Sequence, residues 1–137
     1  MINTKISSAN KKKYYIGLMS GTSADGIDLA LVTFDENRKL EHHASYYQAY
    51  SDETMASITS LYNPGSNEID RAFSLDIELA HLFAQAINNF LYQKQLNSDY
   101  IIAIGSHGQT IRHRPLAPHP FTLQIGCCQT LATLTNI

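Results

Sequence analysis

The stretch YIGLMSGTSADGIDLALVTF, residues 15–34, decides the fold of this chain. Two apolar runs, Tyr14–Met19 and Ile27–Phe34, flank Ser20–Gly26, a segment of small residues, hydroxyls and one carboxylate. Apolar runs bounded by Gly, Ser and Asp predict two strands joined by a tight loop. A hairpin needs only about two to five loop residues, so these small residues are more than the turn requires.

A loop of this composition can bind a phosphate. Glycine permits positive φ and close approach of the backbone, so that successive N–H groups converge on an anion. An ordinary hairpin turn is the alternative, because most Gly/Ser/Asp turns bind nothing. The loop is not a P-loop: Ile27 and Asp28 stand where that motif needs Lys and Ser or Thr, and a strand follows instead of a helix.

Composition points to one globular domain. The 137 residues are 44% apolar and 16% charged, and the net charge of -2 provides no electrostatic footprint for nucleic acid. Residues 1–13 read as a solvated, frayed leader. The apolar run after it is too short for a signal peptide, and no run reaches membrane-spanning length. Adjacent Cys127 and Cys128 offer neither a disulfide nor a metal framework, which favours a reducing cytoplasm.

The middle of the chain predicts a third strand over Leu40–Tyr50 and a short helix over Asp52–Leu61, with Ser51 or Asp52 as its N-cap. A longer helix falls between residues 67 and 97. Its apolar residues recur at intervals of three or four and predict a core-facing stripe. The stripe comprises Ile69, Phe73, Ile77, Ala80, Ala84, Ile87 and Leu91.

The last third begins with a short apolar run, Tyr100–Ile104, which is typical of a buried strand. A polar loop over Gly105–Thr110, a Pro-rich bend, a strand over Phe121–Ile125 and a helix beginning within Cys127–Leu134 follow. A three-strand meander, then helices, then a buried strand predict an α/β or α+β layer.

The predicted second loop carries side chains with binding chemistry. His107 can act as a general base, and Gln109 and Thr110 offer amide and hydroxyl groups suited to a polyol. Arg112 and Arg114, two apart on an extended chain, would point the same way and could bind a carboxylate or phosphate. Each residue also has an ordinary structural reading, as a hydrogen-bonded histidine or as surface charge.

Two catalytic alternatives fail on spacing. Ser106 and His107 are neighbours on an extended segment, so their side chains point apart and form no nucleophile–base pair. The segment is also one residue short of the Gly-x-Ser-x-Gly elbow. No spacing among the six histidines closes a zinc site.

Together, the two segments resemble a known family. Residues 15–28, YIGLMSGTSADGID, are similar to the N-terminal signature of anhydro-N-acetylmuramic acid kinases. Residues 103–113, AIGSHGQTIRH, followed by FTLQIG at 121–126, are similar to that family's second signature. The two motifs occur in the family's order and are joined by a helical segment of plausible length, so the resemblance extends over nearly the whole chain.

The resemblance implies an actin/sugar-kinase/Hsp70-like (ribonuclease H-like) fold, an α/β architecture with a mixed sheet and helices. It implies an enzyme that uses ATP and magnesium to open the 1,6-anhydro ring of anhydro-N-acetylmuramic acid, giving N-acetylmuramic acid 6-phosphate in cell-wall recycling. Residues 14–137 would then form an incomplete first lobe, with no nucleic acid or membrane among its partners.

The resemblance also assigns residues. The loop from Gly21 to Asp28 is expected at ATP: Gly21, Thr22, Ser23, Ala24, Asp25, Gly26, Ile27 and Asp28. The amino-sugar side is expected at His107, Gly108, Gln109, Thr110 and Arg112. Asp25 or Asp28 could help to hold Mg²⁺, since that cation prefers oxygen ligands. No general base is assigned, because the family's catalytic carboxylate is expected beyond Ile137.

Three departures from the family pattern limit this interpretation. Cys127 stands where the family usually has Asp, and Asn136 replaces a usual Gly. Family members are considerably longer, and one lobe alone cannot stabilise phosphoryl transfer from both sides. We therefore expect little or no turnover from the isolated chain and keep a non-catalytic or degenerate binding fragment as the alternative. Apolar surface left by an incomplete domain also predicts self-association, with a homodimer as one form.

Overall fold

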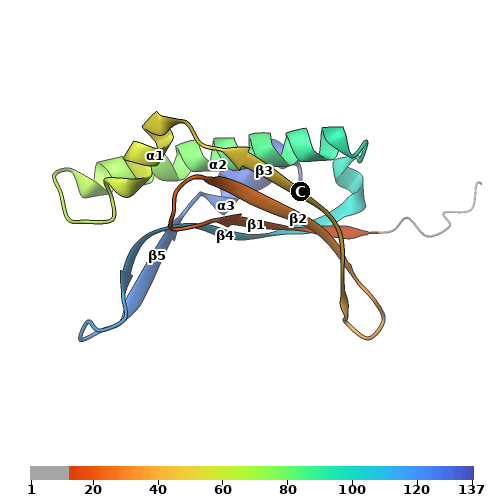
Figure 1. Cartoon of the computed structure of the whole chain (residues 1–137), viewed down its shortest axis with the longest axis horizontal. Coiled ribbons are helices and arrows are strands. Elements are labelled where there is room, and N and C mark those ends of the chain that lie inside the picture. The colour runs from red at the N-terminus through yellow and green to blue at the C-terminus, as the bar shows by residue number, and fades with distance from the viewer. Residues whose placement is uncertain (1–12) are drawn as a thin grey trace, which may run out of the picture.

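The computed structural model describes residues 13–137, so the predicted leader lies almost wholly outside the described residues. The fold is mixed α/β: a five-stranded sheet carries helices on one of its faces (Figure 1). The sheet has the order β3-β2-β1-β4-β5. The strands are β1 (Tyr14–Ser20), β2 (Gly26–Phe34), β3 (Leu40–Ala49), β4 (Ile101–Arg114) and β5 (Phe121–Ile125). The helical segments are α1 (Asp52–Thr59), α2 (Glu68–Gln93), η1 (Ser98–Tyr100) and α3 (Cys128–Thr135).

The meander predicted at the start of the chain is confirmed. β1 pairs antiparallel with β2, and β2 pairs antiparallel with β3. The chain then crosses the sheet through α1, α2 and η1 and returns as β4, which pairs parallel with β1. A parallel neighbour requires such a crossover. β5 completes the sheet antiparallel to β4.

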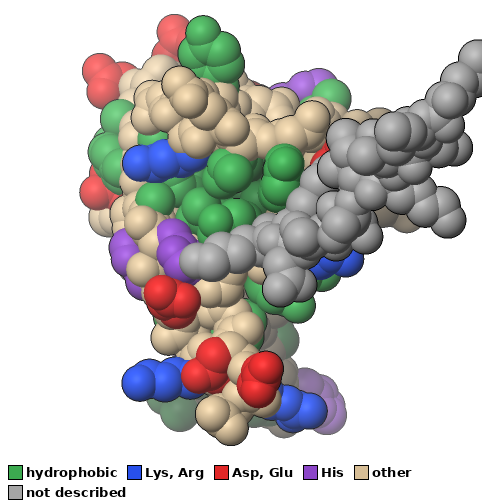
Figure 2. All heavy atoms as spheres, turned by 90° about the vertical axis from the view of Figure 1, so that its right-hand side faces the viewer, with side chains coloured by type: hydrophobic (Ala, Val, Ile, Leu, Met, Phe, Trp, Pro, Cys, Tyr) green, Lys and Arg blue, Asp and Glu red, His purple; other side chains and the backbone are tan. Residues whose placement is uncertain are grey.

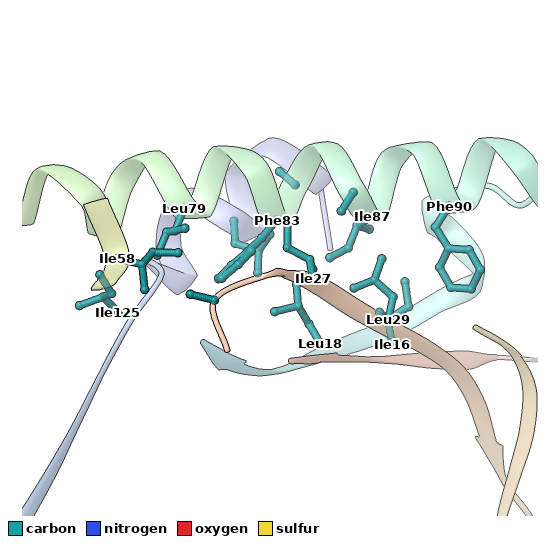
Figure 3. Close-up of a cluster of buried hydrophobic side chains, with 14 of the residues drawn as sticks. Ile16, Leu18, Ile27, Leu29, Ile58, Leu79, Phe83, Ile87, Phe90 and Ile125 are labelled. Atoms are coloured by element: carbon teal, nitrogen blue, oxygen red, sulfur yellow. The ribbon is translucent and has the colours of Figure 1, made fainter. Parts of the chain in front are cut away.

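The core lies between the sheet and α2 (Figure 3). Alternation along β1 and β2 turns Ile16, Leu18, Ile27 and Leu29 toward the helix, and all four are at least 97% buried. From α2, the side chains facing them include the fully buried Leu79, Phe83, Ile87 and Phe90. Burying one side chain of this size contributes about 1.5–3 kcal/mol, so this contact holds α2 on the sheet.

Ser51 is the N-cap of α1, which confirms one of the two predicted N-cap residues. Its Oγ accepts a hydrogen bond from the Thr54 N–H at 3.2 Å. The cap satisfies one of the amide donors that a helix N-terminus leaves without a partner.

The core stripe predicted on α2 is only half correct. Ala80, Ala84, Ile87 and Leu91 are buried, but the residues of the first half, Ile69, Phe73 and Ile77, are 74%, 70% and 43% exposed. These exposed residues share the helical face of the buried four, yet that face is covered only in the second half of α2. Besides Ile87 of the predicted stripe, the sheet faces a second set of α2 residues (Figure 3). This set includes the buried Leu75, Leu79, Phe83, Ala86 and Phe90.

The predicted loop over Gly105–Thr110 is wrong, because these residues lie inside β4. Leu18 pairs with Ser106 and Ser20 pairs with Gln109, so β4 has one more residue than β1 in this interval. The extra residue forms a β-bulge, with Gly108 at φ 69°. Backbone pairing to β1 keeps this polar, glycine-containing run in the sheet.

The second face of the sheet has no described helix on it, and the β2–β3 and β4–β5 hairpins bend away from the helices on that side (Figure 1). The tip of the β2–β3 hairpin carries charged side chains of both signs: Asp35, Glu36, Arg38 and Lys39 (Figure 2). Within residues 13–137, no helix is both long enough and apolar enough to span a bilayer.

Candidate functional site

The loop between β1 and β2 is shorter than the sequence predicts. β1 extends to Ser20 and β2 begins at Gly26, which leaves five residues in the loop. That length is ordinary for a hairpin. The length of the loop is therefore not evidence that it binds a ligand. The Ala24 N–H donates to the Gly21 carbonyl at 3.1 Å and closes a turn with Thr22 and Ser23 exposed at its tip.

Glycine has a different role in this loop from the predicted one. The residue with positive φ is Ala24 at 54°, in a region that side chains rarely adopt. A Cβ placed on Gly21 would meet only Ser23 Oγ, at 3.6 Å, so Gly21 leaves the loop open to approach. Gly26 is enclosed, because its Cβ would lie 2.5 Å from the Gln48 carbonyl oxygen.

The two predicted magnesium ligands are both exposed. Asp25 accepts a hydrogen bond from Ser23 Oγ at 2.7 Å, and its carbonyl accepts one from Tyr47 Oη at 3.0 Å. The pKa of Tyr47 is raised by desolvation and by the charges of Asp25 and Asp28, so Tyr47 lies within the field of both carboxylates. The described residues include no cluster of three or more His, Cys, Asp or Glu side chains that could hold a metal by themselves.

A buried polar network lies beneath the loop. Gln109, fully buried, accepts a short hydrogen bond from Ser20 Oγ through Oε1, and its Nε2 donates to the Gly21 carbonyl at 3.1 Å. Ser20 Oγ also lies 2.8 Å from Tyr50 Oη, and Tyr62 Oη donates to the Thr22 carbonyl at 2.8 Å. Burial raises the pKa of Tyr50 to about 12, so this phenol stays protonated at neutral pH.

The sequence did not identify Ser20, Tyr50 and Tyr62 as site residues. Ser20 ends an apolar strand, and Tyr62 precedes the Asn-Pro-Gly stop of a helix, so each has an ordinary local explanation. The available signal was polarity at a core-facing position: Ser20 continues the alternation of Ile16 and Leu18 and is 1% exposed.

The predicted sugar-side residues divide between the two faces of β4. His107 lies on the open face, where its Nδ1 is 3.3 Å from the Gly108 carbonyl. Thr110 Oγ1 accepts a hydrogen bond from Gln124 Nε2 at 3.0 Å. Gln109, by contrast, uses both ends of its amide inside the protein, so its assignment to a sugar stays a prediction.

Arg112 is anchored to the helical layer. Its guanidinium donates to the Leu61 carbonyl at 3.1 Å and to Glu68 Oε1 at 3.0 Å, and its Nε is buried without a partner among the described residues. The hydrogen bond from Arg112 is the main reason that the pKa of Glu68 lies below its ordinary value. Arg114 donates only to the neighbouring His113 carbonyl among the bonds described, at 3.0 Å.

Two surface hollows bring the predicted segments together. A hollow of about 210 Å³ is lined by Thr22 of the first loop and by Thr110, Arg112 and Arg114 of β4. A second, of about 410 Å³, lies on the open face of the sheet and is lined by Asp28 and His107, with Gly17, Met19 and Gly105 among the other lining residues. Ala24 and Ile27 are fully buried, so of the predicted ATP residues these two present no side chain to either hollow.

Cys127 is the N-cap of α3 and makes no side-chain cap bond to that helix's backbone. Thr130 Oγ1 donates to its Sγ at 3.3 Å, and this bond is the main cause of the lowered pKa of the Cys127 thiol. The Cys127 N–H donates to the Asp76 carbonyl at 3.1 Å, and Asp76 Oδ1 accepts from the Gly126 N–H at 2.7 Å. α2 therefore holds the end of β5 whichever residue stands at 127.

Comparison with known proteins agrees with these motifs. The family model described as anhydro-N-acetylmuramic acid kinase matches residues 13–137. A protein of that name from Colwellia psychrerythraea is 66% identical over 138 residues, covering 100% of this chain and 34% of the relative. Proteins of the same name from Shewanella sp. (strain ANA-3) and Saccharophagus degradans are 47% and 45% identical, and the matches cover 92% and 93% of this chain.

The length of the match limits what these names say of this chain, which spans about a third of the curated relatives it matches. The family match itself covers β1 to α3 and includes both segments that line the two hollows. The chain belongs to the anhydro-N-acetylmuramic acid kinase family.

Proposed function

We propose that this chain supplies the nucleotide loop and part of the sugar side of a kinase acting on 1,6-anhydro-N-acetylmuramic acid. In the proposed reaction water adds at C1, the bond between C1 and O6 breaks, and the γ-phosphoryl group of ATP passes to O6. The products are N-acetylmuramic acid 6-phosphate and ADP. The setting is amino-sugar metabolism during peptidoglycan turnover, in the cytoplasm, and the fold is that of an actin/sugar-kinase/Hsp70-like first lobe.

One observation carries this proposal: Thr22 lines the same hollow as Thr110 and Arg112. The family resemblance assigns Thr22 to the nucleotide and the other two residues to the sugar. A transferring phosphoryl group must have its donor and its acceptor in one place, because catalysis of this reaction is mostly positioning and charge stabilisation. Thr22 and Thr110 are 88 positions apart in sequence, yet they line one hollow, and this proximity supports the proposal.

The loop is compatible with a triphosphate. Gly21 leaves the main chain accessible, and Thr22 and Ser23 present hydroxyls at an exposed tip. We propose that these residues bind phosphate oxygens and that Asp25 or Asp28 binds Mg²⁺ together with those oxygens and water. Mg²⁺ commonly uses only one or two carboxylates beside substrate phosphates, so the lack of a larger acidic cluster is compatible with this role.

The side chains described here provide binding and orientation, and we propose that the general base lies outside residues 14–137. His107 shares a hollow with Asp28 on the open sheet face, where it can donate to or accept from a sugar hydroxyl.

A homodimer stays a prediction. The exposed apolar residues Ile69, Phe73 and Ile77 are the surface through which we expect the isolated chain to associate.

A chimera tests the proposal. This chain replaces the matching 34% of the Colwellia psychrerythraea relative, and ADP release is measured with the anhydro sugar. We expect turnover by the chimera and its loss in Gly21→Val, which fills the approach to the loop. Calorimetry of the 137-residue chain with MgATP gives the binding step alone. Binding without turnover in the chimera would favour the non-catalytic alternative.

The control is Ala132→Val, an exposed position on α3 that adds similar bulk outside the loop. It should leave turnover unchanged, and both variants should melt cooperatively. An active chimera whose ADP release is unaffected by Gly21→Val would refute the assignment of ATP to this loop.

A further inference from the structure

Gln109 faces the helical side of the sheet because of the β-bulge. Regular alternation after Gly105 and His107 would put residue 109 on the open face with them. The extra residue between Ser106 and Gln109 reverses the alternation, and Gly108 takes up the bend with φ 69°. The bulge thus turns a long polar side chain into the core, where burial costs free energy unless every polar atom is paired.

The buried amide is matched at both ends. Oε1 accepts from Ser20 Oγ, while Nε2 lies 3.1 Å from the Gly21 carbonyl, 3.2 Å from the Thr110 carbonyl and 3.4 Å from Tyr62 Oη. This arrangement needs an acceptor and a pair of donors on one flat group, which glutamine supplies and an ionised carboxylate does not. Gln109 therefore fits the loop chemically as well as sterically.

The bond to Gly21 acts on the turn itself. The Gly21 carbonyl that accepts from Gln109 also accepts the Ala24 N–H at 3.1 Å, and Ala24 has the strained φ of 54°. Tyr62 holds the next carbonyl, that of Thr22, at 2.8 Å and is itself within reach of Gln109 Nε2. The two carbonyls that fix the tip of the loop thus both depend on the Gln109 amide, one directly and one through Tyr62.

We infer that Gln109 is a positioning residue that holds the Gly21–Ala24 turn in the conformation presented to the ligand. The Gly108 bulge and the Gln109 amide link β4 to the loop. Gln109 then acts on the nucleotide through the loop and makes no contact with it. The role in ATP binding rests on the proposed function; the control of loop conformation does not.

Amide hydrogen exchange of the 137-residue chain tests the structural step. The reporter is the Ala24 N–H, with the Leu29 N–H in the centre of β2 as the measure of global opening. Gln109→Ala should speed exchange at Ala24 at least 10-fold more than at Leu29. The matched control, Gln124→Ala, removes a glutamine from the adjacent strand whose Nε2 bonds to Thr110 and Thr122 and not to the loop. It should leave the Ala24 rate unchanged.

A second variant guards against unfolding. Gln109→Glu keeps the size and the acceptors but removes the donors, so at neutral pH it should also release Ala24; Tyr62→Phe should release it to a smaller extent. Unchanged Ala24 exchange in the folded Gln109 variants, or the same acceleration in Gln124→Ala, overturns the inference.

Calorimetry with MgATP tests the link to function. We expect the Kd to rise at least 10-fold in Gln109→Glu and to stay unchanged in Gln124→Ala. A released turn with an unchanged Kd would overturn the role in ATP binding. Absence of MgATP binding by both the unsubstituted chain and the chimera would defeat the proposed function, and Ala24 exchange would still decide whether Gln109 positions the loop.

Discussion

Residues 20–26 and residues 105–110 have similar compositions, rich in Gly and small polar side chains, yet the first segment contains a turn between two strands and the second lies within a strand. The difference lies in what each backbone can pair with. Residues 105–110 run beside β1, which bonds to their backbone along most of the segment. Residues 21–25 have no strand beside them and close on themselves through the Gly21–Ala24 bond. Composition marks both as polar and permissive, but pairing decides their conformation.

Glycine has opposite uses within each segment. Gly108 is needed for its positive φ and Gly26 for the close approach of β3, whereas a Cβ on Gly21 or Gly105 would make only ordinary van der Waals contacts. Each segment therefore contains one glycine that the fold requires and one glycine that the fold does not require. Alanine substitutions at these four positions separate folding from binding in both segments.

The largest effect is expected at Gly108. A Cβ there would lie 2.6 Å from the Ile125 carbonyl oxygen, at a φ that side chains rarely adopt. Gly108→Ala should lower the free energy of unfolding by about 3 kcal/mol, measured by urea denaturation followed by circular dichroism. Gly105→Ala is the matched control on the same strand, since its nearest atom is 4.0 Å away. Equal midpoints for the two variants would contradict the bulge.

The next effect is expected at Gly26. Its Cβ would lie 2.5 Å from the Gln48 carbonyl oxygen and 2.7 Å from the Tyr47 ring, and the backbone atom cannot move without disturbing the β2–β3 ladder. Gly26→Ala should cost about 2 kcal/mol of unfolding free energy. Gly21→Ala should cost less than about 1 kcal/mol, measured by the same denaturation. If Gly21→Ala proved the more damaging, the loop would be part of the fold and not an open binding surface.

The comparison also shows what could be predicted from sequence. Local patterns gave β1, β2, β3, β5, α1 and the Ser51 cap, because alternation and capping act between neighbours in the chain. They also marked both hollow-lining segments. Tertiary pairing is invisible to such patterns: nothing local shows that Gly105–Thr110 continues β4, or that a bulge turns Gln109 inward.

The stripe on α2 failed for a related reason. Spacing showed that Ile69, Phe73 and Ile77 share a face with Ala80 and Ile87, and the structure confirms that geometry. Burial, however, depends on what covers the face, and among the described residues that face is covered only along the second half of the helix. The part of α2 over the sheet adds Leu79, Phe83 and Phe90 to Ile87 of the predicted stripe, and the regular spacing of the stripe did not indicate these three residues.

The smallest effect belongs to the pair that fastens the outer part of β4 to α2. Because Arg112 lowers the pKa of Glu68 from the ordinary 4.5, the ionised carboxylate contributes stability above that pH and loses it as pH falls through the lowered pKa. Urea midpoints measured from pH 6 to 3 should fall more for the unsubstituted chain than for Glu68→Gln. The difference should be small, since the pair is partly solvated. Glu78→Gln, on the same helix, neutralises a carboxylate that makes no ion pair with Arg112 and should keep the full acid dependence. Identical pH profiles for the unsubstituted chain and Glu68→Gln would show that backbone pairing alone holds β4, as it holds residues 105–110.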